Sequence, residues 1–217
     1  MKKVAVLLSG AGVFDGSELH EAVLTLLCLT QLGANYQCFA PDIPQMHVVN
    51  HLTGEVDVND KRNVLVESAR IARGNIKACS DLTFAEFDAL VIPGGFGAAK
   101  NLCNFALAGS ECDIDPQVRR FISAFIDDKK PVGFICISPV MIPKLYAAGA
   151  KGTIGHDNDT KLAFNLMGGE HQEADVDQIV VDEANKLVST PAYMLAENIA
   201  QAHSGIQKLV SKVLELA

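Results

Sequence analysis

Residues 132–139 read Val-Gly-Phe-Ile-Cys-Ile-Ser-Pro, an apolar run that stops at a thiol and then meets Ser-Pro. The run predicts a buried strand, and Ser-Pro is typical of a helix start. Cys136 would therefore lie at a strand-to-helix corner, beside the free N–H groups of a helix N-terminus. The partial positive charge at such an end favours a thiolate over a thiol and would also stabilise an oxyanion. The stretch predicts a site of chemistry at this corner.

Similar apolar runs alternate with amphipathic segments along the rest of the chain. Strands are predicted over residues 4–9, 36–40, 87–92 and 132–135, with a hairpin at 178–181 and 187–190. Helices are predicted over 17–32, 64–73 and 141–148, from 98, from 115, and over 196–216 with a break near Gly205. This alternation predicts a single α/β domain over residues 1–217, with helices on both faces of a mostly parallel sheet.

The first predicted helix ends at Gly33, and its apolar side chains recur at helical spacing. We expect the following residues to face the sheet: Leu19, Ala22, Val23, Leu26 and Leu27.

Composition excludes several classes of function. The 217 residues carry a formal charge of −8 and no Lys/Arg run longer than a pair, which argues against nucleic-acid binding. No apolar stretch approaches the roughly 20 residues that a membrane-spanning helix needs. The six cysteines form no C-x-x-C pair, which predicts reduced thiols in the cytosol or an organelle matrix. A cytoplasmic protein is the expectation.

Three loops should meet at the carboxyl edge of the sheet, over residues 9–17, 93–100 and 136–139. Gly94 and Gly95 would let the backbone approach a ligand closely, and the amides of Gly95 and Ile137 could bind a developing oxyanion. The alternative for the glycine pair is a tight turn that merely needs glycine.

Cys136 itself has two interpretations. Free cysteine is more often a small buried hydrophobe than a nucleophile, but the strand end and the glycine loop at the same edge favour a functional thiol. The other five cysteines lack that geometry. Cys112, in a loop beside Glu111, is the only one of them retained as a redox candidate.

Acidic residues follow the first strand. Glu18 is either an ordinary residue of the first helical turn or an acid aimed at the sulfur, and Asp15 and Glu18 could form a capping box. A carboxyl group pressed near a thiol in a dry pocket tends to hold its proton and can shuttle it.

None of the six histidines belongs to a tight ligand set, so neither a metal nor another cofactor is expected. His156 follows a predicted strand at 153–154 and could lie near Cys136. We expect His20, in the first helical turn, and Asp15 to line the pocket.

Residues 10–16, Gly-Ala-Gly-Val-Phe-Asp-Gly, imitate a dinucleotide-binding loop and make nucleotide binding the minority alternative. Asp15 would put a negative charge near the pyrophosphate. The second strand ends in Ala-Pro-Asp at 40–42, which displaces the ribose-binding acid from its expected place.

Several motifs resemble the ElbB type of protein, a branch of the PfpI-like superfamily that shares the class I glutamine amidotransferase fold. They are SGAGVFDGSE at 9–18, HLTGE at 51–55, RNVL at 62–65, PGGFGAAKN at 93–101 and TPAYM at 190–194. The resemblance spans nearly the whole chain. It implies a flavodoxin-like three-layer sandwich, a homodimer, a nucleophile-elbow cysteine at Cys136 and a carboxylic partner at Glu18.

ElbB-type proteins are linked by name to isoprenoid biosynthesis, and related members act as glyoxalases without a cofactor. The resemblance thus implies a glyoxalase III-like enzyme that converts a small aldehyde such as methylglyoxal to lactate. Cys136 would attack the aldehyde, Glu18 would move a proton, and the Gly95 and Ile137 amides would hold the oxyanion. The alternative is a non-enzymatic redox-sensing or regulatory protein of isoprenoid metabolism.

The sequence departs from neighbouring branches at two points. Ile137 stands where protease-like members have histidine, and no late His-x-Glu pair of the glutaminase type follows Cys136. Peptide hydrolysis and ammonia release are therefore disfavoured. His156 occupies a place where the deglycase-like branch also has histidine, which suggests an auxiliary role.

Overall fold

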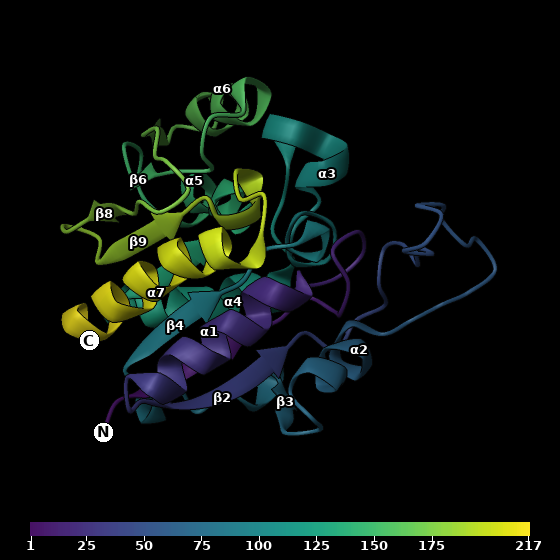
Figure 1. Cartoon of the computed structure of the whole chain (residues 1–217), viewed down its shortest axis with the longest axis horizontal. Helices are drawn as coiled ribbons and strands as arrows, with labels where there is room; N and C mark the ends of the chain where they lie inside the picture. The colour runs from purple at the N-terminus through teal and green to yellow at the C-terminus, as the bar shows by residue number, and fades with distance from the viewer.

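The computed structural model describes residues 1–217 and is built on a seven-stranded sheet in the order β3-β2-β1-β4-β5-β9-β8 (Figure 1). Neighbouring strands are parallel except for β8 and β9, which are antiparallel. The strands are β1 Lys3–Leu7, β2 Asn35–Ala40, β3 Ile76–Ala78, β4 Ala89–Ile92, β5 Val132–Ile135, β8 Val180–Asp182 and β9 Leu187–Thr190. A separate parallel pair joins β6 Lys151–Gly152 to β7 Glu170–His171. The α/β sandwich with a mostly parallel sheet is confirmed.

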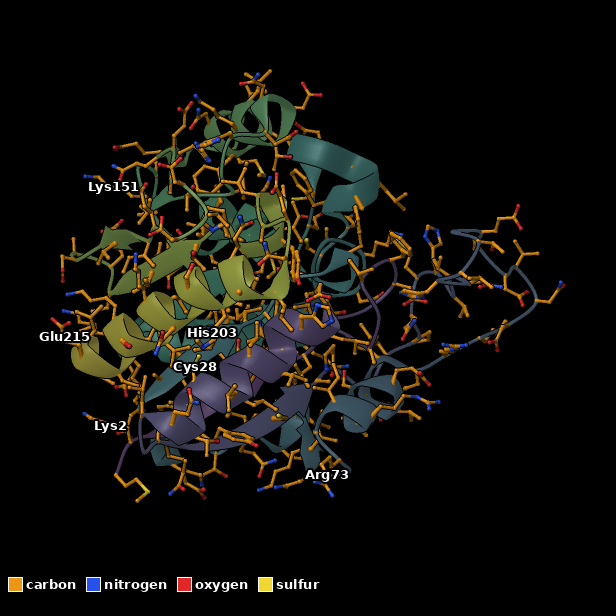
Figure 2. The ribbon with its side chains drawn as sticks, in the orientation of Figure 1. Lys2, Cys28, Arg73, Lys151, His203 and Glu215 are labelled. Carbon is orange, nitrogen blue, oxygen red and sulfur yellow. The ribbon has the colours of Figure 1, made fainter.

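Helices cover both faces of the large sheet. The helices are α1 Leu19–Gln31, α2 Val64–Ile71, α3 Phe105–Ala108, α4 Pro116–Asp127, α5 Ile142–Leu145, α6 Asn158–Leu166 and α7 Ile199–Leu216. Shorter turns are η1 Cys79–Asp81, η2 Phe84–Glu86, η3 Ala98–Leu102, η4 Gly109–Glu111, η5 Ser138–Met141 and η6 Ala192–Met194. One core cluster joins α1 and α7 to the sheet and the other joins α4 and α5 to the opposite face. Figure 2 shows α1 and α7 side by side, with Cys28 and His203 labelled on them. None of the helices is both long and apolar enough to span a bilayer.

The sequence-based assignment of the buried face of α1 is right for Ala22 and Leu26 but wrong for the other three residues. Leu19, Val23 and Leu27 are 46%, 52% and 43% exposed. The residues of α1 that are buried are Glu21, Ala22, Leu24, Thr25, Leu26, Cys28 and Leu29. Apolar residues occur all around this helix, so their spacing alone does not fix which face turns inward. The error matters because the true buried face carries a carboxyl group.

Two other predicted features differ from the structure. Helix α7 is continuous through Gly205, where a Cβ atom would lie 2.6 Å from Thr190 Oγ1 and 2.7 Å from the Val176 carbonyl. This glycine therefore allows close packing rather than a break. Residues 141–148 form only the short turns η5 and α5.

Loops that follow β1, β4 and β5 converge at the carboxyl edge of the sheet, as expected for parallel strands. The Glu18 amide donates to the Gly94 carbonyl at 3.0 Å, and the Gly97 amide donates to the Gly16 carbonyl at 2.8 Å. These bonds tie the first loop to the second, and Cys136 lies at the end of β5 beside them.

Candidate active site

Cys136 lies at a sharp corner between β5 and η5. Its φ angle is +64°, a left-handed conformation that is uncommon for a residue other than glycine. The Ser138 hydroxyl fastens the corner, since it accepts the Ile135 amide at 2.9 Å and lies 3.0 Å from the Ile92 carbonyl, an acceptor on the neighbouring strand. The Cys136 side chain is 7% exposed and lines a cavity. This is the strand–turn–helix geometry of a nucleophile elbow.

The carboxyl group that contacts the thiol belongs to Glu21. Its Oε2 atom accepts the Gly94 amide at 2.9 Å, and its Oε1 atom accepts the Tyr193 amide at 3.1 Å. The same carboxyl is hydrogen-bonded to the Cys136 thiol, and Glu21 is fully buried. Two backbone amides from distant parts of the chain thus orient an acid against the sulfur.

Burial raises the pKa of Glu21 from 4.5 to about 8. The negative charge of Glu18 adds to this rise, whereas the bonds from Tyr193, Cys136 and Gly94 oppose it. Burial, and then the charge of Glu21, also raise the pKa of the Cys136 thiol well above its usual range. At neutral pH the site holds a protonated carboxyl beside a thiol, and ionised Glu21 can accept the thiol's proton.

Two backbone N–H groups are directed at the sulfur of Cys136. They belong to Gly95 and Ile137, and their hydrogen bonds lower the pKa of the thiol against the larger effect of burial. Gly95 has φ +90°, and a Cβ atom there would collide with the Glu18 amide and the Gly16 carbonyl. These are the two amides expected from the sequence, and an oxygen atom bonded next to the sulfur would lie within their reach.

The cavity beside the thiol has a volume of about 480 Å³. Its polar side chains are Glu18, Asp157, Thr160 and Tyr193. The remaining lining residues are Val13, Gly95, Phe96, Ala99, Phe105, Ala106, Ile137 and Met194, together with Cys136. A mostly apolar wall with a few polar groups suits a small ligand.

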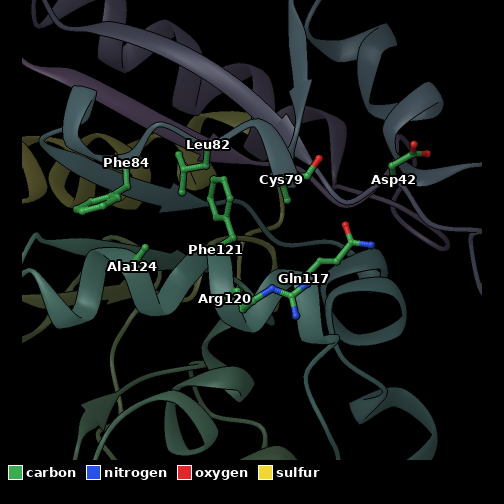
Figure 3. Close-up of a pocket in the computed structure, with 9 residues that line it drawn as sticks. Asp42, Cys79, Leu82, Phe84, Gln117, Arg120, Phe121 and Ala124 are labelled. Carbon is green, nitrogen blue, oxygen red and sulfur yellow. The ribbon is translucent and has the colours of Figure 1, made fainter.

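A larger cavity of about 590 Å³ lies away from Cys136, between α4 and the segment after β3 (Figure 3). It contains Cys79, whose pKa is raised by burial and further by the charge of Asp115. Cys79 interacts with the carboxyl group of Asp115 only through its charge, whereas the Cys136 thiol is hydrogen-bonded directly to the Glu21 carboxyl. Of these two cavity thiols, Cys136 is therefore the one equipped for acid–base chemistry.

Glu18 is the N-cap residue of α1, and its Oε2 atom accepts the Glu21 amide at 2.7 Å. It lines the cavity, but the hydrogen bond to the thiol comes from Glu21, one turn further along the helix. The expected pairing of Glu18 with Cys136 is corrected accordingly. Sequence reasoning missed Glu21 because it assigned the wrong face of α1 to the core. The sequence did contain a sign of Glu21's role, since Glu21 shares a helix face with Thr25 and Cys28, which are also buried.

His156 does not line the cavity. Its side chain is 48% exposed and its Nε2 atom lies 3.6 Å from Asp175 Oδ1. The predicted strand before it does not form at 153–154, because β6 ends at Gly152 and pairs with β7 instead. The neighbouring Asp157, which was not predicted, lines the cavity.

Asp15 and His20 support the site from outside the cavity lining. Asp15 is buried, and its carboxylate accepts the Val49 amide at 2.7 Å. His20 Nδ1 lies 2.8 Å from the hydroxyl of the cavity-lining Tyr193. The expectation that Asp15 and His20 line the pocket is therefore wrong, because both side chains are used in these contacts.

Backbone amides of the loop over residues 10–16 are already hydrogen-bonded to other groups of the protein. The Gly10 amide donates to Ser68 Oγ at 2.8 Å, the Gly12 amide to the Ser17 carbonyl at 2.9 Å, and the Phe14 amide to His51 Nε2 at 3.2 Å. A pyrophosphate-binding loop needs such amides free for its ligand. The structure therefore disfavours the nucleotide-binding alternative.

No family model matches the chain. Over 99% of its length the chain is 44% identical to the rat mitochondrial ES1 protein homolog and to the human mitochondrial glutamine amidotransferase-like class 1 domain-containing protein 3. It covers 84% and 83% of those proteins. The chain belongs to the ES1 family of glutamine amidotransferase-like class 1 proteins.

Solved structures agree with this membership of the ES1 family. An isoprenoid biosynthesis protein with an amidotransferase-like domain from Ehrlichia chaffeensis superposes with a TM-score of 0.92 and 39% identity, over 100% of this chain and 99% of that one. It confirms the resemblance to the ElbB type. Glyoxalase III from Candida albicans shares the fold, with a TM-score of 0.63 at 15% identity over 99% of this chain and 97% of that one.

The names of the rat and human ES1 relatives place them in mitochondria, which contradicts the expectation of a cytoplasmic protein. Cysteine pattern and composition cannot distinguish a cytosolic protein from a protein of an organelle matrix. Targeting depends on signal segments that are not part of the folded domain.

The buried Glu21 carboxyl predicts a distinct pH dependence of stability in this ES1-family protein. Between pH 4.5 and about 8 the unfolded chain releases this proton while the folded protein keeps it. The free energy of unfolding should therefore fall as pH rises through this window, with a slope on the order of 1 kcal/mol per pH unit from this group. Urea unfolding across the window should show a smaller slope for Glu21→Gln than for the wild-type protein. Equal slopes would contradict a protonated Glu21.

Proposed function

We propose that this protein is a cysteine-dependent enzyme that converts small 2-oxoaldehydes such as methylglyoxal to hydroxy acids, without metal or glutathione. The observation that carries the proposal is the hydrogen bond between the Cys136 thiol and the Glu21 carboxyl inside a small cavity. A proton-transfer group in contact with a nucleophile is what such an isomerisation needs. The fold shared with glyoxalase III from Candida albicans is compatible with this chemistry.

The first step is addition of the Cys136 sulfur to the aldehyde carbon. Ionised Glu21 accepts the thiol's proton, a C–S bond forms, and the aldehyde oxygen becomes an oxyanion near the Gly95 and Ile137 amides. Glu21 then gives that proton to the oxyanion, which completes a hemithioacetal and leaves Glu21 ionised. The elevated pKa of Glu21 suits it to both halves of this transfer, because the group is close to half-ionised near pH 8.

Glu21 then moves a proton between the two substrate carbons. It removes a proton from the carbon bonded to sulfur while the ketone oxygen gains a proton, which gives an enediol. It then returns a proton to the adjacent carbon, and the hydroxyl on the carbon bonded to sulfur loses its proton as the new C=O bond forms. The product of this step is a thioester of the hydroxy acid on Cys136. Water hydrolyses the thioester, which frees the thiol and lactate, so that methylglyoxal plus one water gives one lactate.

The size and lining of the cavity limit the substrate class. A mostly apolar wall with Thr160 and Tyr193 as neutral polar groups fits a short aldehyde. Glu18 and Asp157 add acidic side chains to the lining. Carboxylate-bearing aldehydes are therefore expected to be poorer substrates than methylglyoxal.

A redox-sensing role for Cys136 is the weaker alternative. The thiolate is the form that reacts with peroxide, and burial keeps the pKa of Cys136 well above its usual range. The name of the Ehrlichia protein is what links this family to isoprenoid metabolism. A regulatory role there would not require the acid beside the thiol.

Turnover of methylglyoxal tests the proposal. We expect purified protein to produce lactate from methylglyoxal and Cys136→Ala to abolish this activity, because the nucleophile is gone. Cys28→Ala, which removes a buried thiol of α1 outside the cavity, is the matched control and should remain active. Production of lactate at equal rates by the wild-type and Cys136→Ala proteins, or by neither, would refute the mechanism.

A further inference from the structure

Three sulfur atoms gather beside the cavity but outside the Cys136 site. Cys103 and Cys112 are 3% and 0% exposed, and their thiols are hydrogen-bonded to one another. The Cys112 sulfur also lies 3.7 Å from the thioether of Met167. The reaction proposed for Cys136 uses none of these groups, so their association calls for another explanation.

Backbone pairing places the two thiols on one face of a short antiparallel bridge. Cys103 pairs with Ile114, and the flanking bonds are Asn104 N–H to Asp113 O at 3.1 Å and Asp115 N–H to Leu102 O at 3.0 Å. Cys112 precedes Ile114 by two residues, so its side chain projects to the same side as that of Cys103. In this register Cys103 lies opposite Ile114, and Cys112 is its diagonal neighbour on the same face. Closing a disulfide between them therefore needs a small movement of the backbone.

The pair is also suited to oxidation by its hydrogen bonding. The Cys103 S–H group has two acceptors, the Ala98 carbonyl at 3.3 Å and the Cys112 sulfur. Its bond to Cys112 is the main reason why the pKa of Cys112 is lowered to about 7, and the charge of Lys144 acts in the same direction. Cys112 is therefore the thiol of the pair that ionises more readily, whereas burial holds Cys136 in the thiol form.

We propose that Cys103 and Cys112 form a regulatory disulfide in the presence of a hydroperoxide. The Cys112 thiolate attacks a peroxide oxygen, the O–O bond breaks, and Cys112 becomes a sulfenic acid. The departing hydroxide takes up the proton that Cys112 released on ionisation and forms the first water. The Cys103 sulfur then attacks the Cys112 sulfur, the S–O bond breaks, and the departing hydroxide takes the Cys103 proton to form a second water. The two thiols lose two hydrogens, and hydrogen peroxide is reduced to two waters.

Oxidant can reach the pair through the segment that covers it. Residues 104–111 are half-buried or exposed, and their regular structure is limited to the single turns α3 and η4. Segments with so few buried contacts open locally at low free-energy cost. Full burial in the closed state therefore does not prevent reaction.

The disulfide would act on the Cys136 cavity through the same segment. Phe105 and Ala106 line that cavity, and the Phe105 amide is hydrogen-bonded to the Cys103 sulfur. Joining Cys103 to Cys112 fixes the ends of the segment that carries Phe105, which restricts opening of the cavity wall. Oxidation should thus slow access to Cys136. This regulatory part rests on the proposed site, whereas disulfide formation does not.

Peptide mapping tests the disulfide directly. Trypsin cleaves after Lys100 and Arg119, so both cysteines remain on the peptide 101–119, which contains no other cysteine. After peroxide treatment, alkylation under denaturing conditions and digestion without reductant, we expect this peptide unalkylated and two hydrogens lighter than its reduced form. Reduction should restore double alkylation. A doubly alkylated peptide after peroxide, or sulfinic acid on Cys112 beside a free Cys103, would overturn the proposal.

Two variants separate the steps. In Cys103→Ser the partner thiol is missing, so peroxide should leave Cys112 as a sulfenic acid that dimedone traps. In Cys79→Ser, a matched control in the other cavity, the disulfide should still form. Absence of the dimedone adduct in Cys103→Ser would show that Cys112 is not the attacking thiol.

Alkylation of Cys136 in the native protein tests the link to the cavity. Peroxide should slow the reaction of Cys136 with iodoacetamide severalfold in the wild-type protein, reversibly on reduction, and not in Cys112→Ser. An equal loss in both proteins would mean that Cys136 itself is oxidised, and would overturn the link. None of these readouts uses turnover, so failure of the aldehyde reaction would be distinguishable.

Discussion

Glu21→Gln is expected to lower kcat for methylglyoxal by roughly 10²- to 10⁴-fold, the range typical of a lost general acid–base group. Glutamine keeps the size of the side chain but cannot accept the thiol's proton or carry one between the substrate carbons. Both oxygens of Glu21 accept backbone amides, from Gly94 and Tyr193, and the NH₂ group of glutamine cannot replace either acceptor. A loss of about 1–3 kcal/mol in stability should accompany the loss of activity.

Comparison with Glu18→Gln shows which of the two glutamates is the catalytic acid. Glu18 lines the same cavity and caps α1, but the bond to the sulfur is made by Glu21. We expect less than a tenfold fall in kcat for Glu18→Gln. Steady-state kinetics on both variants, with folding checked by circular dichroism, measures the difference. A larger loss for Glu18→Gln would assign the catalytic acid to Glu18 instead.

Gly94→Ala is expected to destabilise the protein and to inactivate it. A Cβ atom at Gly94 would collide with the Cys136 Cβ atom and would lie 2.7 Å from Glu21 Oε2 and 2.8 Å from the Ile135 carbonyl. Backbone and short side chains cannot move aside cheaply, so a cost of about 1–3 kcal/mol is expected. For a chain of this size, thermal unfolding should report it as roughly 2–4 °C per kcal/mol.

Gly133→Ala is the matched control, because Gly133 belongs to β5 and its added Cβ atom would meet only side-chain atoms. The nearest is Leu209 Cδ2 at 2.8 Å, the far end of a side chain that can change rotamer. We expect this variant to lose less stability and to keep its activity. If Gly94→Ala unfolded at the wild-type temperature and turned over methylglyoxal normally, the tight contact between Gly94, Cys136 and Glu21 would be refuted.

Local sequence patterns were sufficient to predict the corner at Cys136 and its two amides. An apolar strand that ends in Cys-Ile-Ser-Pro and another that ends in Pro-Gly-Gly must meet at one edge if the strands are parallel. That inference needs only strand ends and a sheet, which is why Gly95 and Ile137 lie at the sulfur as expected.

The acid was not predictable in the same way. Choosing between Glu18 and Glu21 depends on where α1 starts and which of its faces turns inward, and apolar residues on both sides leave that rotation undetermined. His156 was misplaced for a related reason. The pairing of β6 with β7 joins residues that are distant in sequence, so the local spacing of apolar residues does not predict it. The short strand β3, Ile-Lys-Ala, escaped prediction because three residues show no alternation.

The left-handed backbone conformation of Cys136 means that the residue best for stability differs from the residue needed for reactivity. Glycine would adopt this conformation without steric cost, so stability alone would favour glycine there. Only the sulfur, however, can form a bond with a substrate. Cys136→Gly is thus expected to raise the thermal stability of the protein and to abolish its activity, a trade-off between stability and function.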